Sequence, residues 1–225
     1  MSKLRVFKFV LMAILTTKLT ASSANDPTQL PSVPKQKDPI TIGVTPIFSQ
    51  ILRLTPPSGF GPVYERPGPQ SYIQKLVRFG ETLDKWTQMM TITGTKDIAL
   101  NPNISPKLFA EEIATDFRHD CLTSFNASGL SALNVTGYDG YVAAISCGAM
   151  ANMAGQTSEE VMIIVIKGEH DYYTIQWAER GQKSDTPKVI DPVKWEEHFV
   201  KLTPIKLCAL APSPYRHCMG FKELE

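Results

Sequence analysis

The stretch VMIIVIKGEHDYYTIQWAE, residues 161–179, decides the fold. Both of its ends are rich in β-branched and aromatic residues, and the polar residues 168–171 separate them. The first apolar run, 161–166, is too short to span a membrane and has the length of a strand. The stretch therefore predicts a β-hairpin.

A second hairpin is predicted just upstream of the first. Two apolar segments, 130–135 and 138–147, are joined by Thr136 and Gly137, which form a short turn. Because consecutive strands joined by short turns run in opposite directions, the sheet is predicted to be largely antiparallel. Further strands are expected at 60–65, 71–79, 87–93 and 205–210, whereas 47–54 is only a weak apolar stretch.

Two segments carry the signature of a helix start, a capping residue followed by proline. Ser105 and Pro106 begin a helix predicted over 105–120, and Asp191 and Pro192 begin a second one that ends before Pro204. Apolar residues recur at helical spacing on one face of each: Phe109, Ile113 and Phe117 in the first, and Trp195, Phe199 and Leu202 in the second.

The fold class that follows is α+β, with a largely antiparallel sheet flanked by two main helices. Thr82 is also expected to cap a single helical turn that carries Trp86. A parallel α/β fold would need strands that alternate with helices throughout, and the order of segments in this chain does not show such an alternation.

The N-terminus resembles a secretory signal peptide. A basic start is followed by a short apolar run over 7–15 and by small residues that end at Ala24. We therefore predict a signal peptide over 1–24, cleaved near Ala24, and a periplasmic or secreted location. The proline-rich residues 25–39 predict a disordered leader, and 40–225 a single domain.

The charge of the chain argues against a nucleic-acid partner, and its hydropathy argues against a transmembrane helix after the signal peptide. The chain has 23 basic and 22 acidic residues, and the signal peptide contains four of the basic ones, so the mature chain has 19 against 22 and a net charge of −3. A weakly acidic protein does not have the basic surface that nucleic acids require. After the signal peptide, no segment is apolar for long enough to form a transmembrane helix.

Four cysteines remain in the mature chain: Cys121, Cys147, Cys208 and Cys218. An even number in an exported protein indicates two disulfides, and four cysteines permit three pairings. We favour Cys121–Cys147 and Cys208–Cys218. A metal site formed by Cys208, His217 and Cys218 is the alternative, but the paired spacing typical of zinc sites is absent.

One candidate nucleophile is present. The sequence Ala144-Ile145-Ser146-Cys147-Gly148 resembles the nucleophile elbow of a hydrolase, with Ala in place of the first glycine. Asp171 or Asp191 and His198 or His217 would complete the triad. That elbow requires a parallel sheet, whereas the strands around Ser146 predict hairpins. We therefore predict no catalytic residue, cofactor or metal ligand, and a hydrolase that uses Ser146 remains the alternative.

The aromatic residues permit a second alternative, a protein that binds a small ligand. Aromatic residues beside Arg66 and Arg78 could line a ligand groove, and the candidates are Tyr64, Tyr72, Trp86, Trp177 and Trp195. The simpler interpretation is that Trp86 and Trp195 are core anchors on helical faces and that Trp177 packs on the sheet.

The stretch Phe60-Gly61-Pro62-Val63-Tyr64, the strand 71–79 and the motif Gly80-Glu81-Thr82-Leu83-Asp84-Lys85-Trp86 together resemble a family of uncharacterised exported proteins of Gram-negative bacteria. The closing Cys208 and His217-Cys218 are also similar to that family. The arrangement looks like the α/β/α sandwich of PsbP proteins. This resemblance implies no catalytic residues. The function predicted overall is a non-catalytic periplasmic domain that binds a protein or cell-envelope partner.

Overall fold

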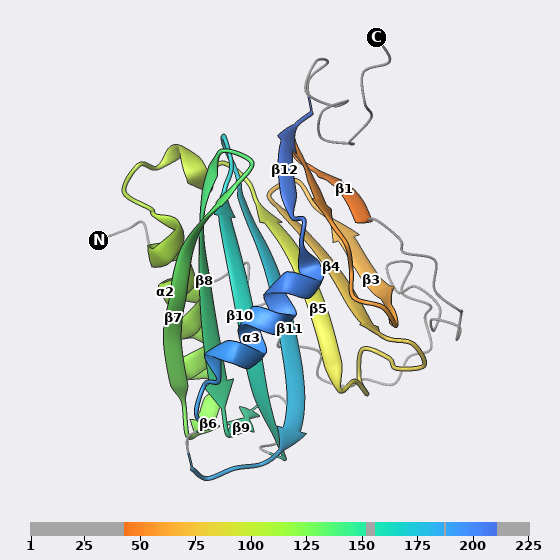
Figure 1. The fold of residues 1–225 in the computed structure, drawn as a ribbon, viewed down its shortest axis with the longest axis vertical. Helices are drawn as coiled ribbons and strands as arrows, with labels where there is room; N and C mark the ends of the chain where they lie inside the picture. Colours follow the sequence, from red (N-terminus) through yellow and green to blue (C-terminus); the bar gives the residue numbers. More distant parts are fainter. Residues whose placement is uncertain (1–42, 152–155, 187, 211–225) are drawn as a thin grey trace.

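The computed structural model describes residues 43–151, 156–186 and 188–210. Its largest element is an antiparallel sheet (Figure 1) of these strands: β3 (Phe60–Pro67), β4 (Ser71–Arg78), β5 (Gln88–Thr95), β7 (Asn126–Val135), β8 (Tyr138–Cys147), β10 (Thr157–Lys167) and β11 (Tyr172–Gln182). The seven strands lie in the order β3-β4-β5-β11-β10-β8-β7. Each neighbouring pair is antiparallel, so the antiparallel sheet predicted from the sequence is confirmed.

The hairpin predicted from 161–179 is confirmed, and it forms the centre of the sheet. Lys167 pairs with Tyr172 across the turn, and both strands have a further partner on their outer side. Met162 and Ile164 belong to the core on one face of the sheet, and Ile163 to the core on the other. All three are fully buried, because a central strand covered on both faces has no solvated side.

The hairpin of β7 and β8 is also confirmed. Val135 pairs with Tyr138, and the two residues between them, Thr136 and Gly137, have φ values of 51° and 95°. Two consecutive positive φ values are typical of the type I′ turn, whose twist matches that of the strands it joins.

A second, smaller sheet packs against the first. It has three strands, in the order β1-β2-β12: β1 (Gly43–Ile47), β2 (Gln50–Leu54) and β12 (Lys206–Ala209). The sequence predicted only the last of these. The hairpin of β1 and β2 was missed because its turn is Phe48-Ser49, with Phe48 at a φ of 54°, and phenylalanine is not a typical turn former. A short pair, β6 (Cys121–Thr123) and β9 (Ala149–Met150), completes the strands described.

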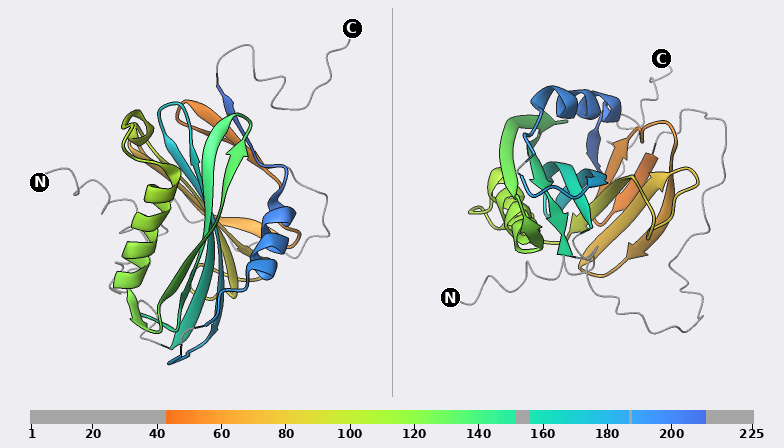
Figure 2. Two further views of the ribbon diagram at one scale, coloured as in Figure 1. Left: turned by 60° about the vertical axis from the view of Figure 1, so that its left-hand side comes forward. Right: turned by 90° about the horizontal axis from the view of Figure 1, so that it is seen from below.

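The two predicted helices are present and lie on opposite faces of the main sheet (Figure 2). The first, α2 (Pro106–His119), contacts β8 and β10 and buries Phe109 and Ile113. The second, α3 (Pro192–Leu202), buries Trp195 and Leu202 on the opposite face. Ser105 and Asp191 cap the two helices, as their sequences predict. One 3-10 turn, η3 (Ile98–Leu100), lies before α2.

The predicted α+β class, a sheet flanked by two helices in the manner of PsbP, is wrong. The described part of the chain is mostly β, with 52% of its residues in strands and 18% in helices. Three observations explain the difference: 47–54 belongs to a hairpin, the central strands are each 11 residues long, and Thr82 begins no helix. The Thr82 hydroxyl does accept the Lys85 N–H, but the chain then enters β5.

The predicted signal peptide 1–24 and the leader 25–39 lie outside the described residues, as does most of the chain after β12. These boundaries remain predictions. Within the described residues, no helix is long and apolar enough to cross a membrane.

Candidate functional site

Five polar side chains of the sheet lie in one row beneath α3. The register places Asn126 opposite Ser146, Ser146 opposite Glu160, Glu160 opposite Glu179, and Glu179 opposite Gln88. These five residues, which we call the polar row, cross five strands on the same face. That face also carries the core residues Ala144, Met162 and Trp177.

Three basic side chains from the segment 188–198 bind this row. Lys188 Nζ lies 3.2 Å from Glu160 Oε1, and Lys194 Nζ lies 3.0 Å from Glu160 Oε2 and 2.7 Å from Glu179 Oε2. His198 Nε2 lies 2.8 Å from Glu179 Oε1. Every one of these side chains is at least two-thirds buried, so the ion pairs are shielded from solvent more than surface pairs are.

The electrostatics of the network favour its charged form. The hydrogen bond with His198 lowers the pKa of Glu179 to about 2, and Lys194 adds to this effect while burial opposes it. Burial favours the neutral amine of Lys194, yet its bonds to Glu179 and Glu160 raise the pKa of Lys194 above its ordinary value. His198 Nδ1 also lies 2.8 Å from the Lys194 carbonyl oxygen, so both ring nitrogens of His198 have a hydrogen-bond partner.

Aromatic rings enclose His198. Its ring centroid lies 4.3 Å from that of Trp177 and 5.1 Å from that of Trp195, both in edge-to-face geometry. Trp177 and Trp195 are 3% and 1% exposed, which confirms that they are core anchors. His198 therefore holds α3 to the sheet by packing as well as by hydrogen bonding.

Ser146, the candidate nucleophile, is part of the polar row and is fully buried. Its hydroxyl donates to the Lys188 carbonyl oxygen at 3.2 Å, and the Asn126 side-chain amide donates to the same oxygen at 3.3 Å. Ser146 lies within β8 rather than at a turn from strand to helix, so it is not on a nucleophile elbow. The hydroxyl fixes the segment that leads into α3, and the geometry does not support the hydrolase alternative.

The other residues proposed for a triad lie elsewhere. Asp191 caps α3 by accepting the Val193 N–H at 3.0 Å. Asp171 lies in the turn between β10 and β11, and its carboxylate accepts hydrogen bonds from the Ser49 hydroxyl and from the Asp97 N–H. His217 lies outside the described residues. The arrangement therefore assigns Asp171 and Asp191 structural roles.

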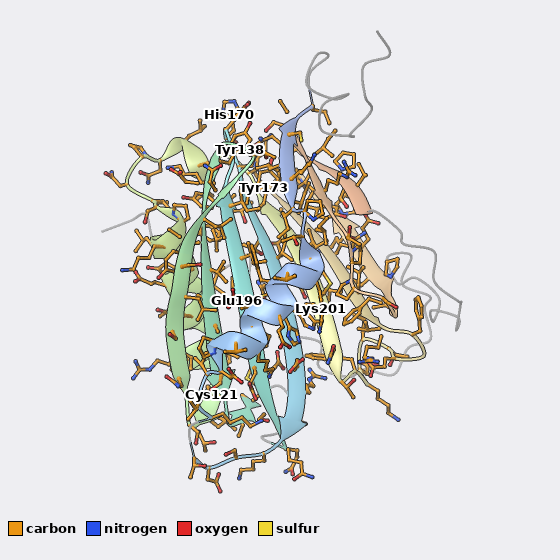
Figure 3. All side chains as sticks on the ribbon, viewed as in Figure 1. Cys121, Tyr138, His170, Tyr173, Glu196 and Lys201 are labelled. Carbon is orange, nitrogen blue, oxygen red and sulfur yellow. A yellow bond between two sulfur atoms is a disulfide. The ribbon has the colours of Figure 1, made fainter. Side chains whose placement is uncertain are left out.

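The disulfide Cys121–Cys147 is present, as predicted, with its Cα atoms 5.6 Å apart. It joins the first residue of β6 to the last residue of β8, at the end of the sheet opposite His170 (Figure 3). Cys208 lies in β12, but Cys218 is outside the described residues, so the second bridge remains a prediction. A disulfide of this kind is typical of proteins that mature outside the reducing cytosol.

A second charged cluster lies on the face that α2 covers. Arg180 Nε is 3.4 Å from Glu159 Oε2, and the Arg180 guanidinium lies 3.5 Å from the centroid of the Trp86 ring. Trp86 and Trp177 belong to the cores of opposite faces, so they do not line one groove. Tyr72 belongs to the same core as Trp177, and its hydroxyl donates to Glu65 Oε1 at 2.7 Å.

The sequence did not reveal the polar row. The only signal was the presence of Glu159, Glu160 and Glu179 in strands that are otherwise apolar, and charged residues in buried strands are expected to have partners. The described residues contain no group of three or more His, Cys, Asp or Glu side chains that could hold a metal. Glu196 and Lys201 of α3 are exposed (Figure 3).

Comparisons with known proteins do not identify a family for this chain. No family model matches the chain. No curated protein matches it by sequence. Among solved structures, a protein described as LpqN, involved in cell envelope biogenesis of Mycobacterium tuberculosis, matches with 12% identity and a TM-score of 0.37, over 74% of this chain and 91% of that chain. This similarity is too weak to support an argument about fold or function, and the resemblance to a Gram-negative family remains an expectation.

Proposed function

We propose that the protein is an exported, non-catalytic domain that binds a protein partner in the cell envelope by accepting an extended segment along β7. The observation that carries this proposal is the open edge of the main sheet. In the described part of the chain β7 pairs with β8 alone, so the backbone groups on its outer side are available to a further strand.

The two edges of the sheet differ in their protection. β3, at one edge, contains Pro62 and Pro67, which have no N–H to donate, and the charged residues Glu65 and Arg66. β7, at the other edge, has the sequence NASGLSALNV, with no proline and no charge over 10 residues. Its one irregularity is a register shift between Gly129 and Ser131, after which the pairing runs regularly to the turn.

The shape of β7 also suits strand addition. Most of its side chains are small and exposed, including Ala127, Ser128 and Ala132, so another backbone can approach without a clash. The absence of charge on β7 favours a partner segment that is itself uncharged and rich in β-branched residues. The disulfide, together with the predicted signal peptide, supports a location outside the cytosol.

The type I′ turn identifies which amides point outward. In such a hairpin Val135 and Tyr138 are the hydrogen-bonded pair, so the pairs Asn134–Asp139 and Ala132–Tyr141 are not bonded to each other. The N–H groups of Ala132 and Asn134 therefore point away from β8. Ala132→Pro removes one outward donor without removing a bond to β8, and Ala132→Lys adds a charge to the edge.

The experiment places a photo-crosslinking residue at Ser131 of the full chain in its native cell envelope. It compares the adducts formed by the otherwise unchanged chain with those formed by three variants. We expect a protein adduct that Ala132→Pro and Ala132→Lys both abolish. Val193→Lys, which alters an exposed residue of α3, should leave the adduct unchanged. Retention of the adduct in both Ala132 variants contradicts the proposal, as does an adduct that consists of a second copy of this chain.

A further inference from the structure

Four charged residues on the α2 face form a cluster outside the polar row. Three of them lie two positions along a strand from a residue of the core beneath α2, so their side chains are on the α2 face. The pairs are Lys75 and Val77 in β4, Arg180 and Ala178 in β11, and Glu159 and Val161 in β10. Arg66 of β3 is opposite Ile73, which places it on the same face. We call Arg66, Lys75, Glu159 and Arg180 the cationic cluster.

Lys75 lacks a direct partner. Its side chain is half-buried, and within the described residues its ammonium makes no hydrogen bond or ion pair. Burial lowers the pKa of Lys75, Glu159 opposes that change, and the neighbouring charges of Arg180 and Arg66 lower the pKa further. A buried ammonium without a partner destabilises a folded protein unless some group compensates it.

The charges of the cluster do not balance. Three cations face one carboxylate, and that carboxylate is already bound by Arg180. Burial raises the pKa of Glu159, which further weakens it as a counter-charge. Arg180 uses Nε for Glu159 and rests on the ring of Trp86, and its terminal N–H groups have no hydrogen-bond partner in the described part of the chain.

Neutral hydrogen-bonding groups lie beside these cations. The register aligns Tyr64, Lys75, Thr91 and Gln176 in one row across four strands on the α2 face. Thr91 is buried, Tyr64 and Gln176 are half-buried, and Arg66 is exposed. The row therefore begins at the half-buried Tyr64 of the edge strand β3, and Lys75 of β4 is its second member.

We propose that the cationic cluster binds a small anionic ligand, with a carboxylate or phosphate group of the ligand held between Lys75 and Arg180. The anion supplies the counter-charge that the cluster lacks. The guanidinium of Arg180, fixed by Trp86, offers two parallel donors that fit either group. Lys75 adds a point charge, and Thr91 and Gln176 add neutral donors. This site is independent of the edge strand β7 and of the function proposed for it.

The test measures thermal unfolding of the full chain with increasing inorganic phosphate, citrate or, at the same ionic strength, chloride. We expect phosphate or citrate, but not chloride, to raise the midpoint by about 3–5 °C at a concentration tenfold above the dissociation constant. A response to phosphate alone indicates a phosphate ligand, and a response to citrate alone a carboxylate. If neither phosphate nor citrate raises the unfolding midpoint more than chloride does, the proposal is overturned.

Two variants with the same change of charge complete the test. Lys75→Met should abolish the anion-dependent shift and raise the midpoint of the ligand-free protein, because it removes an uncompensated ammonium. Lys201→Met, on the exposed side of α3, should leave the shift unchanged. If Lys75→Met does not fold, equilibrium dialysis of the wild type against labelled phosphate and labelled citrate decides. Saturable binding of either anion at one site supports the proposal. If neither anion binds at a saturable site, the proposal is overturned.

Discussion

Glu159 and Glu160 are consecutive residues of β10, yet their carboxylates lie on opposite faces of the sheet and bind different cations. Glu159 binds Arg180 on the α2 face, and Glu160 binds Lys188 and Lys194 on the α3 face. Successive side chains of a strand point in opposite directions, so one dipeptide contributes to two separate networks.

These neighbours should therefore respond differently to the same substitution. Glu160→Gln removes the carboxylate that binds Lys188 and Lys194, so we expect faster hydrogen exchange in 188–202 and a loss of about 1–3 kcal/mol of stability. Glu159→Gln should leave exchange in that segment unchanged, because its partner lies on the other face. Equal acceleration in both variants would contradict the separation of the two networks.

Glu179 should make the stability of the protein depend on acid. Its pKa falls from an ordinary value of 4.5 to about 2 in the folded protein, chiefly through His198. The stabilisation is therefore fully present above about pH 4.5 and is lost as the pH falls toward about 2, and it amounts to about 2 kcal/mol after an allowance for solvent screening.

Urea unfolding of the wild type and Glu179→Gln at about pH 6 and about pH 3 measures this dependence. The variant should lose less stability on acidification than the wild type, because it has no carboxylate to protonate. Glu197→Gln, an exposed change on α3, should behave as the wild type does. A variant as acid-sensitive as the wild type would show that other groups cause the effect.

Loss of the disulfide should destabilise the protein. The bridge joins residues 26 positions apart, and the loop-closure model predicts about 3.5 kcal/mol for a loop of that length. The double substitution Cys121→Ala with Cys147→Ala should lower the free energy of unfolding by this amount without changing the far-ultraviolet circular dichroism. An unchanged free energy of unfolding would show that the bridge contributes nothing to stability.

Sequence reasoning succeeded where a local signal was sufficient. Thr136-Gly137 indicated the turn between β7 and β8, and the capping residues Ser105 and Asp191 marked both helix starts. The pairing of Cys121 with Cys147 followed from the expected proximity of a helix end and a strand end. These features depend on residues close together in the chain or on few alternatives.

The polar row required information that the sequence does not contain. Its five members come from five strands, and only the register of the sheet aligns Ser146 with Glu160 and Glu179. The hairpin at Phe48 was missed because the positive φ of its turn falls on phenylalanine rather than on a typical turn residue. The fold class was wrong in part because β1, β2, β6 and β9 were not predicted as strands.

The core beneath α3 should be far more sensitive to substitution than the outward side of that helix. Trp195 is 1% exposed and packs on His198, so Trp195→Ala should cost about 3–5 kcal/mol. Val193, two residues earlier, is 62% exposed, and Val193→Ala should change stability by less than about 0.5 kcal/mol. Chemical denaturation of both variants measures the contrast, and a small effect of Trp195→Ala would mean that α3 contributes little to the fold.

Asp171 joins the two sheets. It is 1% exposed, and its Oδ2 accepts the Ser49 hydroxyl at 2.8 Å and the Tyr173 hydroxyl at 3.3 Å, while Oδ1 accepts the Asp97 N–H at 2.9 Å. Burial raises the pKa of Tyr173, so its phenol stays protonated and able to donate. The carboxylate therefore connects the turn of β1 and β2 to the main sheet.

Asp171→Ala should cost about 3 kcal/mol, because it leaves several buried donors without an acceptor. Hydrogen exchange should accelerate first in 43–54, the hairpin that Asp171 holds. It should accelerate only slightly in β10, because that strand is hydrogen-bonded to a neighbouring strand on both sides. Asp185→Ala, whose carboxylate is 76% exposed, is the matched control and should change neither stability nor exchange. Uniform acceleration across both sheets in Asp171→Ala would mean that the two sheets unfold as one unit and that Asp171 is not a local connection between them.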